Sequence, residues 1–514
     1  MPTAMIPPPL GGWNTSDALA VMGAEFAPTL DNLIPEQGRL RVRPGWRTWA
    51  TGLPGRVDGL LDWRSGGRRR LFAAAGTGIY EVTGPGAVGA AAVDGATSAR
   101  WEGLMVNAVG GDFLFACNGA DTPRTFDGTS WAAWTGAGVP TPSWSCTLKG
   151  RLYVGRPDRL SFWYGIPGGI GGAFNEYPLQ GVARRGGGIA GMATWTRDGG
   201  RGSDDAAALI TTEGEVLVYE GLDPGDASSW GLTGSYQLPR PLGVNVGGAS
   251  GRFLREFGGD VLALTEGGVF ALGALVSGAD QAGLGAVAYT KRIEPSFLEM
   301  ARGRGTLAGW ELVPLPVHGL WLVNVPWGAS DAQQVAFAAA SGAACRFAGV
   351  PAACWAEAGG RAYFGHARDG RVCLWGEDEA DDGHAISAEC VGAFGTFGGA
   401  GLKRFTLAQP VLSDATDAAV RLDVVLDWQV PTPEIAARGP AAPPSATAVD
   451  GAGRWDAGVW DEASWAGEGE VSRAWRAVRG IGQAGAVRLR IAANGSRPGW
   501  LGTGLVWERG GAVR

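Results

Sequence analysis

Short apolar runs separated by glycine-containing turns recur between residues 71 and 376. In each case an alternating or continuous apolar run leads into Gly with Thr, Glu or Asp, and a second apolar run follows. This pattern is typical of β-hairpins. The sequence predicts six of them, at Leu71–Val82, Phe113–Phe126, Leu152–Tyr164, Ala208–Tyr219, Val261–Leu272 and Ala362–Trp375.

The spacing of these hairpins favours one repeated unit. Their starts are 42, 39, 56, 53 and 101 residues apart, and the longest interval contains a further strand at Leu320–Val325. Because a four-stranded propeller blade takes about 40–50 residues, the spacing predicts a degenerate β-propeller over residues 51–384. A set of unrelated hairpins in sandwiches is the alternative. The one helix expected, Ile293–Ala301 with Pro295 near its first turn, would connect two blades.

The repeat stops near residue 384. Beyond it, strands are predicted at Val420–Val430, Ala486–Ala492 and Gly504–Glu508, and a Pro/Ala-rich loop spans residues 431–448. Residues 385–514 therefore read as a β-sandwich-like domain with this loop as an excursion, and residues 1–50 as an N-terminal arm that closes the propeller. The expected fold class is all-β.

Composition supports this interpretation. The chain has 514 residues, of which 88 are glycine, and it is 45% hydrophobic and 18% charged, so it is globular with many chain reversals rather than a helical bundle. A net charge of −7 disfavours a protein that grips nucleic acid. Residues 1–13 lack the pattern of a signal peptide, and no apolar run reaches the ~18 residues of a membrane span. We expect a soluble protein made in a cytoplasm.

Candidates for catalysis or metal binding are few. The three histidines and six scattered cysteines show no ligand spacing, and GxSxG, HExxH and Walker motifs are missing, so no cofactor or metal is expected. Thr125–Trp131 (TFDGTSW) approaches the Asp-box of sialidases but lacks one residue, and a hairpin turn is the favoured interpretation. Paired carboxylates of a propeller glycosidase stay open.

Two charge clusters stand out. The acidic run consists of Glu377, Asp378, Glu379, Asp381 and Asp382. It could be a solvated loop, a calcium site, or part of an acidic ring that lets DNA slide through a channel without adhering. The basic cluster Arg64–Arg70 could dock on an acidic neighbour or be a solvated turn.

The N-terminal block, residues 7–46, carries a recognisable signature: a Gly-Gly-x-Asn start, an Asp-containing turn, a Leu-x-Asn strand and a closing Arg-x-Gly. It resembles the tail nozzle (tail tubular or hub) proteins of short-tailed bacteriophages. Gln334–Phe347, Arg361–Gly376 and Ala474–Leu489 also resemble stretches of that family, although Cys345 replaces a usual aromatic residue and Ser-Asp-Ala after Asn14 replaces a more basic turn. The matching signature positions are Gly11, Gly12, Asn14, Asp17, Leu30, Asn32, Arg43 and Gly45.

The resemblance implies a virion protein of the tail and not an enzyme. Six copies would form a propeller-based ring below the portal-bound adaptor, continue the channel for double-stranded DNA and contact fibres or a tail tip. Asn14, Asp17, Asn32 and Arg43 are then the expected docking segment. The alternatives are a propeller enzyme acting on glycans, such as a depolymerase or glycosidase, and a propeller adhesin.

Overall fold

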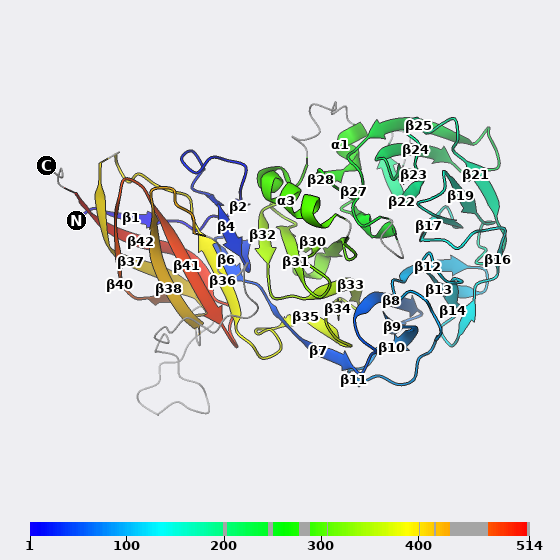
Figure 1. Ribbon diagram of the computed structural model, residues 1–514, viewed down its shortest axis with the longest axis horizontal. Coiled ribbons are helices and arrows are strands. Elements are labelled where there is room, and N and C mark those ends of the chain that lie inside the picture. The colour runs from blue at the N-terminus through cyan, green and yellow to red at the C-terminus, as the bar shows by residue number, and fades with distance from the viewer. Residues whose placement is uncertain are drawn as a thin grey trace.

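The computed structural model describes residues 1–198, 203–244, 250–276, 288–305, 307–399, 401–415, 418–431 and 471–510. These residues form an all-β molecule with two parts, a propeller and a sandwich, which lie side by side in Figure 1. The first strand, β1 (Thr3–Ile6), and the last, β42 (Gly499–Arg509), both lie in the sandwich. The expected all-β propeller fold is confirmed. Most of the Pro/Ala-rich loop 431–448 lies outside the described residues.

The propeller is built from small antiparallel sheets that follow one another along the chain. Blade 1 consists of β8 (Val57–Ser65), β9 (Arg68–Ala75) and β10 (Gly78–Glu81), and blade 2 of β12 (Glu102–Ala108), β13 (Gly111–Cys117), β14 (Arg124–Phe126) and β15 (Trp131–Ala133). Blade 3 consists of β17 (Trp144–Leu148), β18 (Arg151–Gly155), β19 (Ser161–Tyr164) and β21 (Asn175–Pro178). Blade 4 consists of β22 (Ile189–Asp198), β23 (Ser203–Thr211), β24 (Glu215–Gly221) and β25 (Trp230–Gln237).

Three further blades complete the ring. Blade 5 consists of β26 (Leu254–Phe257), β27 (Asp260–Thr265) and β28 (Gly268–Ala271). Blade 6 consists of β29 (Glu311–Leu315), β30 (Leu320–Pro326), β31 (Ala332–Ala338) and β32 (Ala344–Phe347). Blade 7 consists of β33 (Ala352–Ala358), β34 (Arg361–His366), β35 (Val372–Asp378) and the N-terminal β7 (Gly45–Thr51). The first strands of the blades contact one another in order, and β33 of blade 7 contacts β8 of blade 1. The described residues thus form a closed ring of seven blades.

All six predicted hairpins occupy the same place in their blades, the second and third strands. The strand expected at Leu320–Val325 begins the equivalent hairpin of blade 6, β30 with β31. The helix expected at Ile293–Ala301 is α3 (Glu294–Arg304), with proline in its first turn, and it connects blades 5 and 6. A short helix, α1 (Leu272–Val276), follows blade 5. No helix in the described ranges is long and apolar enough to cross a membrane.

The sandwich has two sheets. A seven-stranded sheet contains β5 (Leu33–Glu36), β6 (Arg39–Val42), β42 (Gly499–Arg509), β37 (Lys403–Ser413) and β39 (Val471–Arg473), with β1 (Thr3–Ile6) beside β42 and β40 (Arg476–Gly482) beside β37. The opposite layer is β4 (Thr29–Asp31), β36 (Ile386–Val391), β41 (Gly485–Ala493) and β38 (Ala418–Leu426), and it continues through β4 into β32 of blade 6.

The first 50 residues, expected to be a single arm, divide between the two parts. Strand β7 pairs with β35 and completes blade 7, whereas β1, β4, β5 and β6 join the sandwich sheets. The sandwich is therefore assembled from both ends of the chain: β42 pairs with the C-terminal β37 on one edge and with the N-terminal β6 and β1 on the other. The described residues also contain two two-stranded ribbons, β2 (Gly12–Trp13) with β3 (Phe26–Ala27) and β16 (Gly136–Ala137) with β20 (Gly172–Ala173). Strand β11 (Gly86–Ala87) pairs with β7 at the edge of blade 7.

Candidate functional site

Arg43 is the centre of the junction where the N-terminal arm, the propeller and the sandwich meet. Its side chain is fully buried. Its guanidinium donates to Asp381 through two nitrogens, at 2.8 and 2.6 Å, and also to the carbonyl oxygens of Pro44 and Ala348 and to Asn32 Oδ1. The planar fork of arginine suits such a set of acceptors. Arg43 is thus committed to contacts within the chain.

Asn32 supports the same junction. It lies between β4 and β5 with φ of 56°, a left-handed conformation that asparagine tolerates better than most residues. Its Nδ2 donates to the carbonyls of Ala348 and Ser387, at 3.1 and 2.7 Å, and its Oδ1 accepts from Arg43 and from the Ala348 amide. One asparagine side chain therefore joins the end of blade 6 to the start of the sandwich.

A second buried ion pair joins Asp31, the residue before Asn32, to Arg346. Arg346 on β32 donates to both carboxylate oxygens of Asp31 on β4, at 2.7 and 2.6 Å. Both residues are buried. Because β4 is the strand shared between blade 6 and the sandwich, this pair fixes the continuous sheet at the point where the two parts join.

Asn14 and Asp17 form a turn that contacts the propeller. Asn14 is buried, donates to Asp17 Oδ2 at 2.7 Å and accepts from the Ser16 and Asp17 amides. The turn is held against the propeller because the Ser16 hydroxyl donates to the Lys291 carbonyl. Of the four residues expected to dock on a partner, only Asp17 is exposed. Of the four expected docking residues, Asn14, Asn32 and Arg43 are therefore structural, since buried side chains cannot contact another protein.

The glycines of the signature have steric reasons. A Cβ on Gly45 would lie 2.0 Å from the Ala380 carbonyl oxygen, and one on Gly12, whose φ is 89°, would lie 2.7 Å from the Ala344 carbonyl oxygen. A Cβ on Gly11 would lie 2.5 Å from the Phe26 ring. These close backbone approaches require glycine.

The acidic run is divided between internal and surface roles. Asp381 belongs to the Arg43 pair, with only 13% of its side chain exposed. Asp382 accepts from the Thr48 amide and from Arg371, and these hydrogen bonds hold its pKa below the usual range despite the opposing effect of desolvation. Glu377 and Asp378 pair with Arg47 at 3.3 and 3.4 Å. Glu379 is exposed. Side chains of the run therefore bind residues of β7, and the run does not form one free acidic surface.

The centre of the propeller is occupied by ion pairs. Arg252, which precedes blade 5, reaches across the ring and donates to the carbonyls of Asp58 in blade 1 and Trp101 at blade 2, at 2.8 and 2.9 Å. It also faces Glu311 of blade 6 at 4.0 Å. Burial raises the pKa of Glu311, and the charges of Arg252 and Arg255 act against that rise.

Arg255 extends this central network. Its guanidinium contacts Glu102 of blade 2 at 3.4 Å and Glu311 at 3.6 Å. Glu311 also accepts from the Trp355 amide of blade 7. Five blades are thus tied together by these charged side chains.

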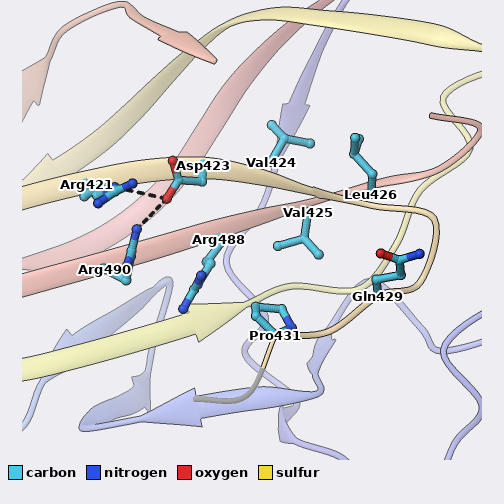
Figure 2. A pocket seen from close by; sticks show the side chains of 9 residues that line it. All are labelled: Arg421, Asp423, Val424, Val425, Leu426, Gln429, Pro431, Arg488 and Arg490. Carbon is cyan, nitrogen blue, oxygen red and sulfur yellow. Dashed lines mark hydrogen bonds and ion pairs between the residues drawn. The ribbon is translucent and has the colours of Figure 1, made fainter. Parts of the chain in front are cut away.

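A surface hollow of about 450 Å³ lies on the sandwich over β38 and β41. Figure 2 shows the side chains that line it. Arg421 and Arg490 both point toward Asp423, with nitrogen-to-oxygen distances of 3.3 and 2.6 Å. Arg488 donates to Glu389 at 2.7 Å. The arginines of this hollow are engaged with carboxylates, so it does not present a cluster of free cations.

The remaining sequence candidates have structural roles. Asp127 of the Asp-box-like stretch accepts from the Thr129 and Ser130 amides, both at 2.7 Å, in the turn between β14 and β15, and these bonds lower its pKa. In the basic cluster, Arg69 and Arg70 pair with Asp62 and Glu81. All six cysteines are buried and unpaired. Among the described residues, no three His, Cys, Asp or Glu side chains gather as a metal site.

The chain matches no protein family model and no curated protein. Solved structures with partial similarity include BBS1N in complex with ARL6DN (16% identity over 45% of this chain and 73% of that one, TM-score 0.29). They also include the computationally designed Ika8 protein (11% identity over 64% of this chain and 99% of that one, TM-score 0.34). A third is a quinonprotein alcohol dehydrogenase-like protein from Bacteroides thetaiotaomicron VPI-5482 (12% identity over 62% of this chain and 68% of that one, TM-score 0.36).

Proposed function

We infer that the chain is a structural subunit of the tail nozzle of a short-tailed bacteriophage, where several copies form a ring around the path of the ejected DNA. The inference starts from the resemblance of residues 7–46 to that family. Its partners would be further copies of itself, the adaptor above the ring, and fibres or a tail tip.

The observation that carries the proposal is that the signature residues converge. Asn32, Arg43 and Gly45 are neighbours in one buried junction, and Asn14 and Asp17 shape the turn whose Ser16 hydroxyl binds the propeller. Chance matches have no reason to take complementary roles in one buried junction. Their convergence supports a shared architecture as the source of the resemblance.

A junction of this kind suits a protein whose two parts must keep a fixed relative position. Buried bidentate ion pairs and a continuous sheet oppose hinge motion between propeller and sandwich. In a ring, the channel would run between copies, because Arg252, Arg255 and Glu311 link the blades within each propeller. Contact with the adaptor would use residues other than the buried Asn14, Asn32 and Arg43.

The glycan-acting enzyme has less support. A glycosidase needs two carboxyl groups that reach the substrate, one of them free to donate a proton. At the propeller axis, Glu102 and Glu311 each face arginine and accept backbone N–H groups, and Asp58 pairs with Arg56 at 2.7 Å. These carboxylates are engaged in holding blades together.

Electron microscopy of virions labelled with antibodies against this chain tests the proposal. We expect label at the tail and rings of six copies. Label confined to the capsid or missing from virions would contradict the nozzle assignment. Release of reducing sugar from host polysaccharide by the purified chain would favour the enzyme instead.

A further inference from the structure

Five arginines are buried among the residues that the structure describes: Arg43, Arg100, Arg252, Arg346 and Arg490. Four of them form an ion pair with a carboxylate, at nitrogen-to-oxygen distances of 2.6 to 4.0 Å. Arg100 differs from them. It is 7% exposed, it forms no ion pair within the described ranges, and its buried Nη1 atom has no hydrogen-bond acceptor there. The charge of Arg100 therefore lacks the compensation that the other four arginines have.

Arg100 lies at the centre of the propeller, shortly before the first strand of blade 2. The carbonyl of the next residue, Trp101, accepts a hydrogen bond from Arg252 at 2.9 Å, so the two arginines are close neighbours. Burial and the nearby charge of Arg252 lower the pKa of Arg100 to about 10. Because that pKa is still far above neutral pH, Arg100 is positively charged in the folded chain.

The carboxylates whose charges act on Arg100 are committed to other arginines. They belong to Asp58 and Glu311. Asp58 accepts a hydrogen bond from Arg56 at 2.7 Å, and Glu311 lies 3.6 Å from Arg255. Neither carboxylate forms an ion pair with Arg100. Burial of a charge without a partner is unfavourable, and buried charges in folded proteins are accordingly paired.

These groups belong to one cluster in which cations outnumber anions. We call it the central cluster. It contains four arginines and three carboxylates, which are Arg56, Arg100, Arg252, Arg255, Asp58, Glu102 and Glu311. A counter-ion that balances the central cluster should therefore carry a single negative charge.

We propose that the central cluster binds a small monovalent inorganic anion, such as chloride, at Arg100. The anion accepts a hydrogen bond from Nη1 and compensates the positive charge. Its small size follows from burial, because a residue that is 7% exposed leaves little access for a carboxylate of another protein or for a DNA phosphate. A doubly charged anion is disfavoured because Asp58 and Glu311 repel it.

Urea denaturation of the full chain tests the site. Sodium chloride is exchanged for sodium gluconate, whose anion is bulky, at constant ionic strength so that screening stays the same. We expect chloride to stabilise the folded chain. An anion that binds only the folded state raises the ratio of folded to unfolded protein about tenfold for each tenfold increase in its concentration above the dissociation constant. Phosphate at the same ionic strength should stabilise less, and a larger effect of phosphate would overturn the assignment to a monovalent ion.

Arg100→Met removes the cation and should abolish the difference between chloride and gluconate. In gluconate this variant should be at least as stable as the wild type, because it removes a buried charge that has no partner. Arg64→Met is the matched control, since Arg64 is exposed on blade 1, and it should keep the chloride dependence of the wild type. The same chloride dependence in the Arg100→Met variant and in the wild type would overturn the proposal.

A second measurement needs no variant. Crystals of the full chain grown in sodium bromide should give an anomalous diffraction peak, at the bromine absorption edge, in contact with Nη1 of Arg100. Absence of that peak from crystals that bind bromide elsewhere on their surface would show that water rather than an anion occupies this position, and it would overturn the proposal.

Discussion

Buried charge in this chain is stabilised by geometry at the level of single residues. Arg43 makes five short hydrogen bonds, two of them to Asp381, and so the cost of removing its guanidinium from water is offset within one small junction. Arg346 and Asp31 repeat the arrangement nearby. Removing one partner leaves the other buried without compensation.

Arg43→Met should therefore lower the free energy of unfolding by about 3–5 kcal/mol. Urea denaturation followed by tryptophan fluorescence measures the change. The matched control is Arg70→Met, because Arg70 pairs with Glu81 at 2.8 Å but both side chains are more than 40% exposed, and exposed pairs contribute about 1 kcal/mol or less. Equal effects of the two substitutions would contradict the structural role given to Arg43.

At the scale of elements, β7 is the strand on which closure of the propeller depends. It completes blade 7 by pairing with β35. Arg371 binds it from the side, donating to Thr48 Oγ1 at 3.0 Å while also contacting His366 Nε2 at 3.2 Å. His366 is buried beside the Trp46 ring. The imidazole is thus part of the packing that holds the closing strand.

The closing strand should be sensitive to acid. Burial lowers the pKa of His366 to about 4, against 6.5 for an exposed histidine. Since the folded state then binds a proton less readily than the unfolded state, this contribution is complete above about pH 6.5 and is lost as the pH falls toward 4, by about 3 kcal/mol at most.

Urea denaturation at pH 7 and pH 4.5 tests this dependence. His366→Gln should reduce the pH-dependent loss of stability, whereas His384→Gln, at an exposed position, should leave it as in the wild type. If the two variants show the same pH dependence, His366 is not the group responsible.

At the scale of the whole molecule, propeller and sandwich share one core. A single apolar cluster includes Trp195 of blade 4, Trp375 of blade 7, and Leu489 and Trp507 of the sandwich. The sheet through β32, β4 and β36 crosses the same boundary. Neither part buries its junction surface without the other, so we expect them to unfold together.

Leu489→Ala tests this coupling, because it removes a fully buried side chain of β41 and should cost about 2–5 kcal/mol. Hydrogen exchange should then accelerate in blades 6 and 7 as well as in the sandwich. Leu402→Ala, at a position that is 37% exposed, is the control and should change neither region. Acceleration confined to the sandwich would show that the two parts unfold independently.

The sequence alone determined the local elements of this protein. The hairpin between Leu152 and Tyr164 and its five counterparts were predictable because strand alternation and turn chemistry act over a few residues. Their spacing indicated a propeller, and the strand at Leu320 marked the blade that the repeat had obscured. The helix at Glu294–Arg304 was likewise readable from its proline and apolar positions.

Which segments lie side by side depends on the folding of the whole chain. Arg43 and Asp381 are 338 positions apart, and Asp31 and Arg346 are 315 apart, so no local pattern announced either pair. The polar signature residues looked like a surface for a partner, yet their side chains were needed to satisfy buried backbone groups where three segments meet. The acidic run likewise contacts β7, because pairing of β7 with β35 places Arg47 and Thr48 beside it. Long-range contacts of this kind depend on chain folding as a whole, whereas hairpins depend on their own residues.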